Sequence, residues 1–369
     1  AVTVSLLITS VSAFGMYGVD GDDWINFLVH GNQFRARMDQ LGFVLGNGTI
    51  KGTVGLRADT GWIANILSIN NGHNSPLTSE TKSFNPTASV GIGYTSDMIG
   101  IGVGYNFTYI DRFVQVHTPV VVLNALNNNL RLAIPIQVAV AKDLGTGDDN
   151  TKFTSVGFNA LELRYLTGID AFNQIRVYFN YRNSTLETSA DKSVSESFGL
   201  QVRLYFARTE IGNVTVNPYI RVDYDQALKG SSRGSYLTVA NNYMNYDYID
   251  SKNKQSDIYD VSPFRVFVKP VLSLAASSDT VSLYFEPSLG YAVVSSKYKG
   301  ADQVTTHALN WGAYAELYVR PVQDLEWYFE MDVNGNVNGS KKANLDLPPV
   351  LFETTTGITW YLPSLGGNQ

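Results

Sequence analysis

The chain has 369 residues, a formal net charge of −6 and no cysteine. Charged residues make up only 16% of the chain, against about 25% in a typical soluble domain, and the mean hydropathy of −0.07 is too low for a bundle of membrane helices. The missing cysteines exclude a disulfide framework and thiolate metal sites, and the modest acidity argues against a nucleic-acid partner, which calls for a basic patch.

The first fifteen residues predict a signal for export. They read AVTVSLLITSVSAFG, an apolar run of small and β-branched residues in which Ala13 and Gly15 suit a cleavage site. Polar YGVDGDD follows Met16. We interpret residues 1–15 as a signal peptide without its basic n-region, so that the mature chain begins at Met16. A buried N-terminal strand is the alternative.

The rest of the chain alternates between apolar and polar side chains. In DLEWYFEMDVN (324–334), Leu, Trp, Phe, Met and Val occupy one parity, whereas Glu326, Glu330 and Asp332 occupy the other. A period of two predicts a strand with two different faces. The pattern recurs in QIRVYFNYR (174–182) and SLYFEPSLGYAVV (282–294). Strands of this kind exceed the usual length of about five or six residues.

Turn signals divide the alternating chain into segments. In chain order we expect strands over residues 34–46, 49–59, 87–95, 98–109, 113–123, 131–141, 153–165, 174–187, 193–206, 213–225, 261–275, 280–295, 307–320, 324–336 and 351–362. An even count needs one more strand, for which 24–30 is the candidate. The alternative is fourteen strands, if the first hairpin is misread and 24–30 is a short helix. The long outer loops are expected near residues 60–86, 226–260, 296–306 and 337–350.

Long two-faced strands with aromatic ends are typical of transmembrane β-barrels. Closure of the barrel satisfies every backbone polar group in lipid, whereas a soluble β-sandwich would have shorter strands. We therefore predict that residues 16–369 form a single all-β domain, a transmembrane antiparallel up-and-down β-barrel of about sixteen strands, with fourteen to eighteen left open. It is expected in outer-membrane lipid, with its loops exposed at the cell surface.

The polar parity of the predicted strands separates charges by sign. Sequence neighbours are wall neighbours in a meander, so one wall of the lumen is expected to be basic and the other acidic, which would select among solutes. The alternative is a structural network in which neighbouring charges pair. The expected pore-lining residues are Arg176, Arg182, Arg203, Arg221, Arg265, Lys269, Glu286, Glu316, Glu326, Glu330 and Asp332.

Motifs that carry catalysis are missing from the sequence. It holds four histidines and no P-loop, GxSxG or HExxH motif. We therefore predict no enzyme activity, no catalytic residue, no cofactor and no metal site. The glycine-rich GIGYTSDMIGIGVGYN (91–106) is interpreted as a hairpin in which glycine relieves crowding or permits curvature.

The residues GNQFRARMDQLGFVLGNGTIKGTVGLRADTGW (31–62), preceded by MYGVDGDDWINFLVH (16–30), resemble the variable surface protein (Vsp) family of Brachyspira spirochaetes. The resemblance implies an abundant, surface-exposed outer-membrane protein, one of a set of paralogues whose loops vary antigenically. It supplies no catalytic residues and does not decide whether the barrel conducts.

Two functions follow from these patterns. The first is a surface antigen that is also a passive diffusion porin with a charged lumen, passing small hydrophilic solutes or ions. The second is a non-conducting surface barrel that binds host matrix or mucin through Tyr- and Asn-rich loops, above all 226–260. Host surface molecules and antibodies are the expected partners of the loops, nucleic acid is not expected, and a homo-oligomer is left open.

Overall fold

A computed structural model describes residues 24–59, 85–109, 113–142, 151–230, 249–250, 252–338 and 351–366. The predicted signal peptide and most of the predicted outer loops at 60–86, 226–260 and 337–350 lie outside these residues. Among the described residues, no helix has the length and apolar character needed to cross a membrane.

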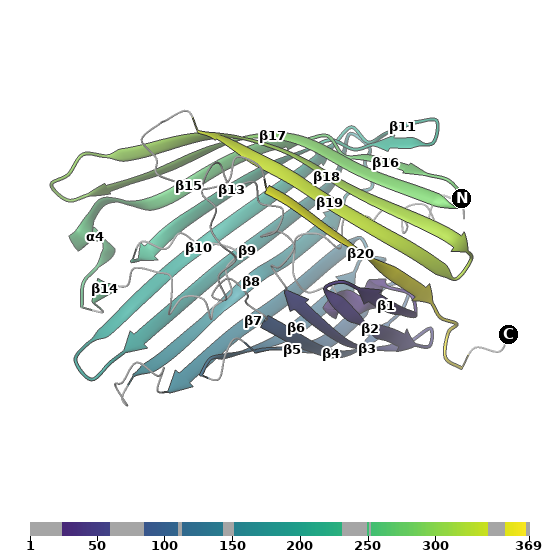
Figure 1. Ribbon diagram of the computed structural model, residues 1–369, viewed down its shortest axis with the longest axis horizontal. Coiled ribbons are helices and arrows are strands. Elements are labelled where there is room, and N and C mark those ends of the chain that lie inside the picture. The colour runs from purple at the N-terminus through teal and green to yellow at the C-terminus, as the bar shows by residue number, and fades with distance from the viewer. Residues whose placement is uncertain are drawn as a thin grey trace, which may run out of the picture.

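The described strands form a closed antiparallel barrel of sixteen strands (Figure 1). In order around the wall they are β1 (Gln33–Arg37), β2 (Gln40–Gly46), β3 (Ile50–Asp59), β4 (Asn85–Thr95), β5 (Gly100–Tyr109), β6 (Gln115–Ala125), β7 (Leu130–Lys142), β8 (Lys152–Leu166), β9 (Phe172–Glu187), β10 (Lys192–Phe206), β13 (Tyr219–Lys229), β15 (Tyr259–Val271), β17 (Val281–Tyr298), β18 (Val304–Val322), β19 (Leu325–Asn338) and β20 (Leu351–Tyr361). Each strand pairs with the next, and β1 pairs with β20 to close the wall. The predicted fold class is confirmed.

Short elements extend the two ends of the barrel. At one end, the hairpin of β11 (Thr209–Ile211) and β12 (Val214–Val216) pairs with β16 (Leu274–Ser277), which pairs with β17. At the other end lie β14 (Ile249–Asp250) and the one-turn helix α4 (Gln255–Ile258) (Figure 1). We call these the β11 end and the α4 end. The connections 47–49, 96–99, 126–129, 167–171 and 323–324 at the β11 end are short, whereas 60–84 and 230–258 at the α4 end are long.

The structure corrects the prediction for the N-terminal strands. Segment 24–30, the candidate for an extra strand, contains instead a 3-10 helix, η1 (Ile25–Val29). The predicted strand 34–46 is two strands, β1 and β2, which pair with each other around Met38 and Asp39. The total of sixteen therefore holds for a different reason, because this split supplies the strand that η1 does not.

The predicted outer loop at 296–306 is also shorter than expected. Strand β17 continues to Tyr298 and β18 begins at Val304, with Val281–Ser296 paired to Val304–Val319 across the hairpin. Only residues 299–303 remain as a connection. The two strands therefore stay paired through Ser295 and Ser296, which the sequence interpretation had assigned in part to the loop.

The two faces of the barrel wall differ as the alternation predicts. Along β9, Gln174, Arg176 and Tyr178 are buried, while Ile175 and Val177 between them are partly exposed. On other strands, large apolar side chains are more than half exposed, among them Val54, Val103 and Leu289. An apolar outer face around a polar interior is the arrangement expected of a barrel in lipid.

Inside the barrel, η1 packs against glycines of the wall. Trp24, Phe27 and Leu28 are buried. A Cβ added to Gly55 would lie 2.4 Å from the Trp24 ring, and one added to Gly102 would lie 2.9 Å from the Phe27 ring. Real Cβ atoms do not come so close, so η1 occupies space that only glycine leaves open. The glycines of segment 91–106 therefore leave room for the side chains of η1.

Candidate functional site

One row of basic side chains crosses six neighbouring strands of the wall. Each member lies directly opposite the next in the strand register, from β7 through β8, β9, β10 and β13 to β15. We call this row the basic ladder; its members are Arg131, Arg164, Arg176, Arg203, Arg221 and Lys269. Like charges directly opposite each other repel, so the ladder depends on the groups around it.

Part of that repulsion is offset by polar partners on the same strands. The carboxylate of Glu162 pairs with Arg164 at 2.7 Å, and the carboxylate of Asp223 pairs with Arg221 at 2.8 Å. Each partner is two residues away from its arginine, so both side chains point to the same face of the strand. These ion pairs hold two of the ladder's guanidinium groups in place.

Aromatic rings cover other members of the ladder. The guanidinium carbon of Arg176 lies 5.3 Å from the centroid of the Tyr205 ring, and that of Arg203 lies 4.9 Å from the Tyr178 ring. Attraction between a guanidinium and the face of an aromatic ring stabilises the cation without neutralising it. The ladder therefore remains basic where tyrosine is the partner.

The inward faces of β17, β18 and β19 carry the acidic wall, which we define as Glu286, Glu316, Glu326, Glu330 and Asp332. Glu316 lies directly opposite Glu330. Glu316 is fully buried and accepts hydrogen bonds from the hydroxyls of Tyr314 and Tyr318. Its surroundings are those of a closed hydrogen-bond network rather than of open water.

Two more carboxylates of the acidic wall are also buried and hydrogen-bonded. The hydroxyl of Tyr328 donates to Glu330. Glu326 accepts from the hydroxyl of Tyr361 at 3.1 Å and from Nε of Arg320 at 2.7 Å. Neighbouring tyrosines and Arg320 therefore hold these carboxylates in place.

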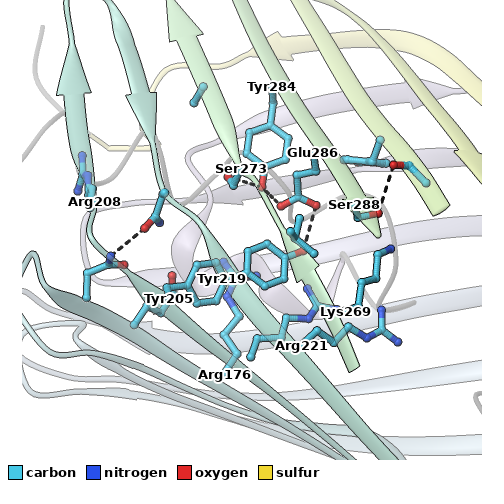
Figure 2. Close-up of a pocket in the computed structure, with 18 of the residues that line it drawn as sticks. Arg176, Tyr205, Arg208, Tyr219, Arg221, Lys269, Ser273, Tyr284, Glu286 and Ser288 are labelled. Carbon is cyan, nitrogen blue, oxygen red and sulfur yellow. Dashed lines mark hydrogen bonds between the residues drawn. The ribbon is translucent and has the colours of Figure 1, made fainter. Parts of the chain in front are cut away.

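A cavity of about 510 Å³ separates part of the basic ladder from part of the acidic wall. Four ladder members line it, together with two members of the acidic wall; these six residues are Arg176, Arg203, Arg221, Lys269, Glu286 and Asp332. Figure 2 shows Tyr219 and Tyr284 reaching Glu286, with Arg221 and Lys269 nearby. The arrangement can attract a charged solute, hold it and orient it between groups of opposite sign.

The remaining predicted pore-lining residues lie on the inward face but outside the cavity lining. Arg182 is buried on β9, and Arg265 pairs with Asp225 at 2.5 Å. Glu316, Glu326 and Glu330 belong to the tyrosine network. The sequence interpretation therefore named the inward side chains, of which the structure brings six together around one space.

Several inward residues of the site were missed by the sequence interpretation. Arg131 begins the basic ladder, and Glu162, Asp223 and Asp225 supply its acidic partners and those of Arg265. A usable signal was present: Asp223 and Asp225 share the parity of Arg221 on one strand. Opposite charges two residues apart on one face could have been expected to pair.

Comparisons with known proteins give two solved structures and one family model that resemble the chain. Among solved structures, the chain is similar to the FrpB iron transporter from Neisseria meningitidis (F3-3 variant), with a TM-score of 0.39 and 10% identity over 93% of this chain and 69% of that one. It is also similar to the outer-membrane expressed OmpT of Vibrio cholerae, with a TM-score of 0.31 and 9% identity over 75% of this chain and 89% of that one. No curated protein matches. The family model described as Serpulina hyodysenteriae variable surface protein matches residues 1–361, so the chain belongs to the variable surface protein family.

Proposed function

We propose that the protein is a surface-exposed barrel that lets small hydrophilic solutes and ions cross the outer membrane by passive diffusion. The observation that carries this proposal is the cavity between the basic ladder and the acidic wall. A closed barrel with an apolar outer face and a wet, charged interior is the general form of a diffusion pore. The charges on its two walls would set a field across the path of a solute.

The proposed mechanism is passive and uses no cofactor. Solutes enter from either end, lose part of their hydration among the lining side chains and leave down their concentration gradient. Selectivity comes from which cations and carboxylates remain exposed to the path. We propose no enzyme activity. Among the described inward carboxylates, Glu316 and Glu326 accept hydrogen bonds from tyrosines, and Asp223 pairs with Arg221.

The difference between the two ends of the barrel supports a proposed orientation in the membrane. Outer-membrane barrels keep short turns on the periplasmic side and long loops outside. We place the β11 end toward the periplasm and the α4 end at the cell surface, where the long connections 60–84 and 230–258 would be open to antibodies and host molecules. This placement accords with membership of a surface protein family.

A second function, a non-conducting surface barrel, is favoured by the filling of the lumen. Helix η1 packs on the inner wall, and the tyrosine–glutamate network fills space beside the acidic wall. If these groups block the path, function would lie in the Tyr- and Asn-rich segment 226–260, whose expected ligands are host matrix or mucin.

Conductance of single molecules in a planar lipid bilayer separates the two functions. Protein refolded into detergent and shown to be folded by its heat-modifiable gel mobility would be added at low and high salt. Discrete, reproducible current steps support the pore, and the reversal potential in a salt gradient tells whether anions or cations pass more readily. A silent bilayer from folded protein contradicts the pore and favours the adhesin.

A further inference from the structure

We infer that the cavity beside the basic ladder is a binding subsite for oxyanion groups, the phosphate or carboxylate of a small solute. Its role in permeation rests on the proposed pore, but the binding itself does not and can be measured without conduction. The inference stands on three observations: two cations without polar partners, an acid held by tyrosines, and the size and lining of the cavity.

Arg176 and Lys269 are the cations that the fold leaves available. Within the described part of the chain, neither has a hydrogen bond or an ion pair, and the guanidinium carbon of Arg176 lies 5.3 Å from the centroid of the Tyr205 ring. Arg176 is only 8% exposed, and its Nε is buried without an acceptor. Burying a guanidinium without an acceptor is costly. Because Arg176 lines the cavity, a ligand oxygen there would give its guanidinium group an acceptor.

The chemistry of these groups favours oxyanions. The planar fork of an arginine matches the two oxygens of a carboxylate or phosphate, and lysine adds a compact positive charge. Arg203 and Arg221 line the same cavity on the strands between Arg176 and Lys269. The four cations therefore form a concave row along one side of the space.

Among the described residues, Glu286 makes no ion pair with this row, and its carboxylate is held by tyrosines. It accepts a hydrogen bond from the hydroxyl of Tyr219 at 3.2 Å and another from Tyr284, whose oxygen in turn accepts from Ser273 at 3.0 Å. Hydroxyl donors satisfy the carboxylate and fix it on its own wall. Counting the described residues that line the cavity, the basic side chains outnumber the acidic ones by five to three.

The cavity has the size of a small-molecule site. Its volume of about 510 Å³ falls within the range of roughly 300–1,000 Å³ that is usual for such pockets. Amides of Asn217 and Asn310 and the ring of Tyr314 also line it. These groups suit the neutral polar part of an organic anion, while the row of cations takes its charged end.

Isothermal titration calorimetry of the folded protein in detergent tests the binding, with inorganic phosphate and succinate as probes at constant ionic strength. We expect saturable binding to the natural protein. The double variant R176Q/K269Q should bind at least tenfold more weakly. The control K297Q removes a lysine on β17 that pairs with Asp260 outside the cavity lining, and it should bind like the natural protein.

The outcomes separate this inference from the proposed pore. Absence of binding to the natural protein, or an equal loss in K297Q, overturns the subsite. If R176Q/K269Q does not fold, the single variant K269Q and titration of the natural protein still decide. In planar bilayers, phosphate should lower chloride current with saturation. If the protein forms channels that phosphate does not affect and calorimetry detects no binding, the subsite is overturned and the proposed pore stands. Binding without any channel sustains the subsite and overturns the pore.

Discussion

Arg176 and Arg203 lie directly opposite each other on β9 and β10, and each guanidinium lies over a tyrosine of the other's strand. Arg176 is 5.3 Å from the Tyr205 ring, and Arg203 is 4.9 Å from the Tyr178 ring. Two like charges in register repel, and the crossed rings offset that repulsion. These two cation–ring contacts stabilise the charges of Arg176 and Arg203.

Replacing one ring of this crossed pair should weaken the barrel. We expect Tyr178→Leu to lower the free energy of unfolding by about 1–3 kcal/mol, from lost cation–π attraction and lost ring packing, and Tyr178→Phe to lower it much less. Urea titrations of folding into lipid vesicles would measure both. A double-mutant cycle of Tyr178→Leu with Arg203→Met should give a coupling of about 1 kcal/mol. A coupling near zero would show that the ring merely fills space.

The glycines under η1 give a second prediction. A valine at position 55 places its Cβ where the Trp24 ring now lies, so Gly55→Val should displace η1 from the wall while leaving the strands paired. Chymotrypsin cleaves after Trp, Phe and Leu, and in the natural protein Trp24, Phe27 and Leu28 are buried. We expect chymotrypsin to cleave rapidly at these residues in the variant and slowly in the natural protein. Mass spectrometry of the fragments over time would measure both rates.

Gly52 is the matched control for this experiment. It lies on the same strand, β3, with the opposite parity, and a Cβ there would meet only the carbonyl oxygen of Gly91 at 3.6 Å, an ordinary contact. Gly52→Val should therefore leave η1 protected. Equal protection of both valine variants would show that η1 does not depend on the glycine at 55. In planar bilayers, displacing η1 should also raise the conductance of the proposed pore.

Replacing acids of the lumen with amides should change ion selectivity at some positions and stability at others. Asp332 lines the cavity and accepts only a long hydrogen bond of 3.4 Å from Asn334 among the described residues. Glu316 is fully buried between Tyr314 and Tyr318. We expect Asp332→Asn to shift the reversal potential toward anion preference with little loss of stability. Glu316→Gln should lower the free energy of unfolding by about 1–3 kcal/mol and leave selectivity unchanged.

Reversal potentials in a salt gradient and urea titrations, made on both amide variants, test this division. A change in selectivity from Glu316→Gln would place that carboxylate in the ion path. An unchanged selectivity in Asp332→Asn would show that ions do not pass the acidic side of the cavity. Glu286→Gln offers a third comparison, since its carboxylate lines the cavity but is held by Tyr219 and Tyr284.

The strands and their inward faces could be predicted because a period of two is a local property of the sequence. The first hairpin shows where this fails. In the segment 34–46, the outward apolar parity changes from even at Phe34 and Ala36 to odd at Leu41 and Phe43. A bulge within one strand and a tight turn between two strands both move the outward side chains from even to odd positions, so the sequence alone does not distinguish them. The pairing of Ala36 with Leu41 shows that it is a turn.

The charge partners could not be predicted in the same way, because they depend on register between strands. Arg176 and Arg203 meet only because the turn between β9 and β10 fixes that register, and a slip of one residue would turn one of them into lipid. Nor could the lumen position of η1 be read from its sequence, since WINFLVH is compatible with a strand or a helix. Its place follows from glycines far along the chain.

The outer face supplies a prediction that depends on the membrane rather than on the lumen. Leu200 lies near the middle of β10 with its side chain outward and 38% exposed. An arginine on the lipid face near the bilayer midplane costs about 2–4 kcal/mol, and the cost falls to about 0–1 kcal/mol near the interfaces. Leu200→Arg should therefore lower the free energy of unfolding in vesicles by the larger amount. Ile211→Arg, on the exposed β11–β12 hairpin beyond the barrel wall, should change it little. Equal tolerance of the two arginines would mean that the middle of β10 does not face hydrocarbon, whereas the expected difference would fix the depth of the barrel in the bilayer.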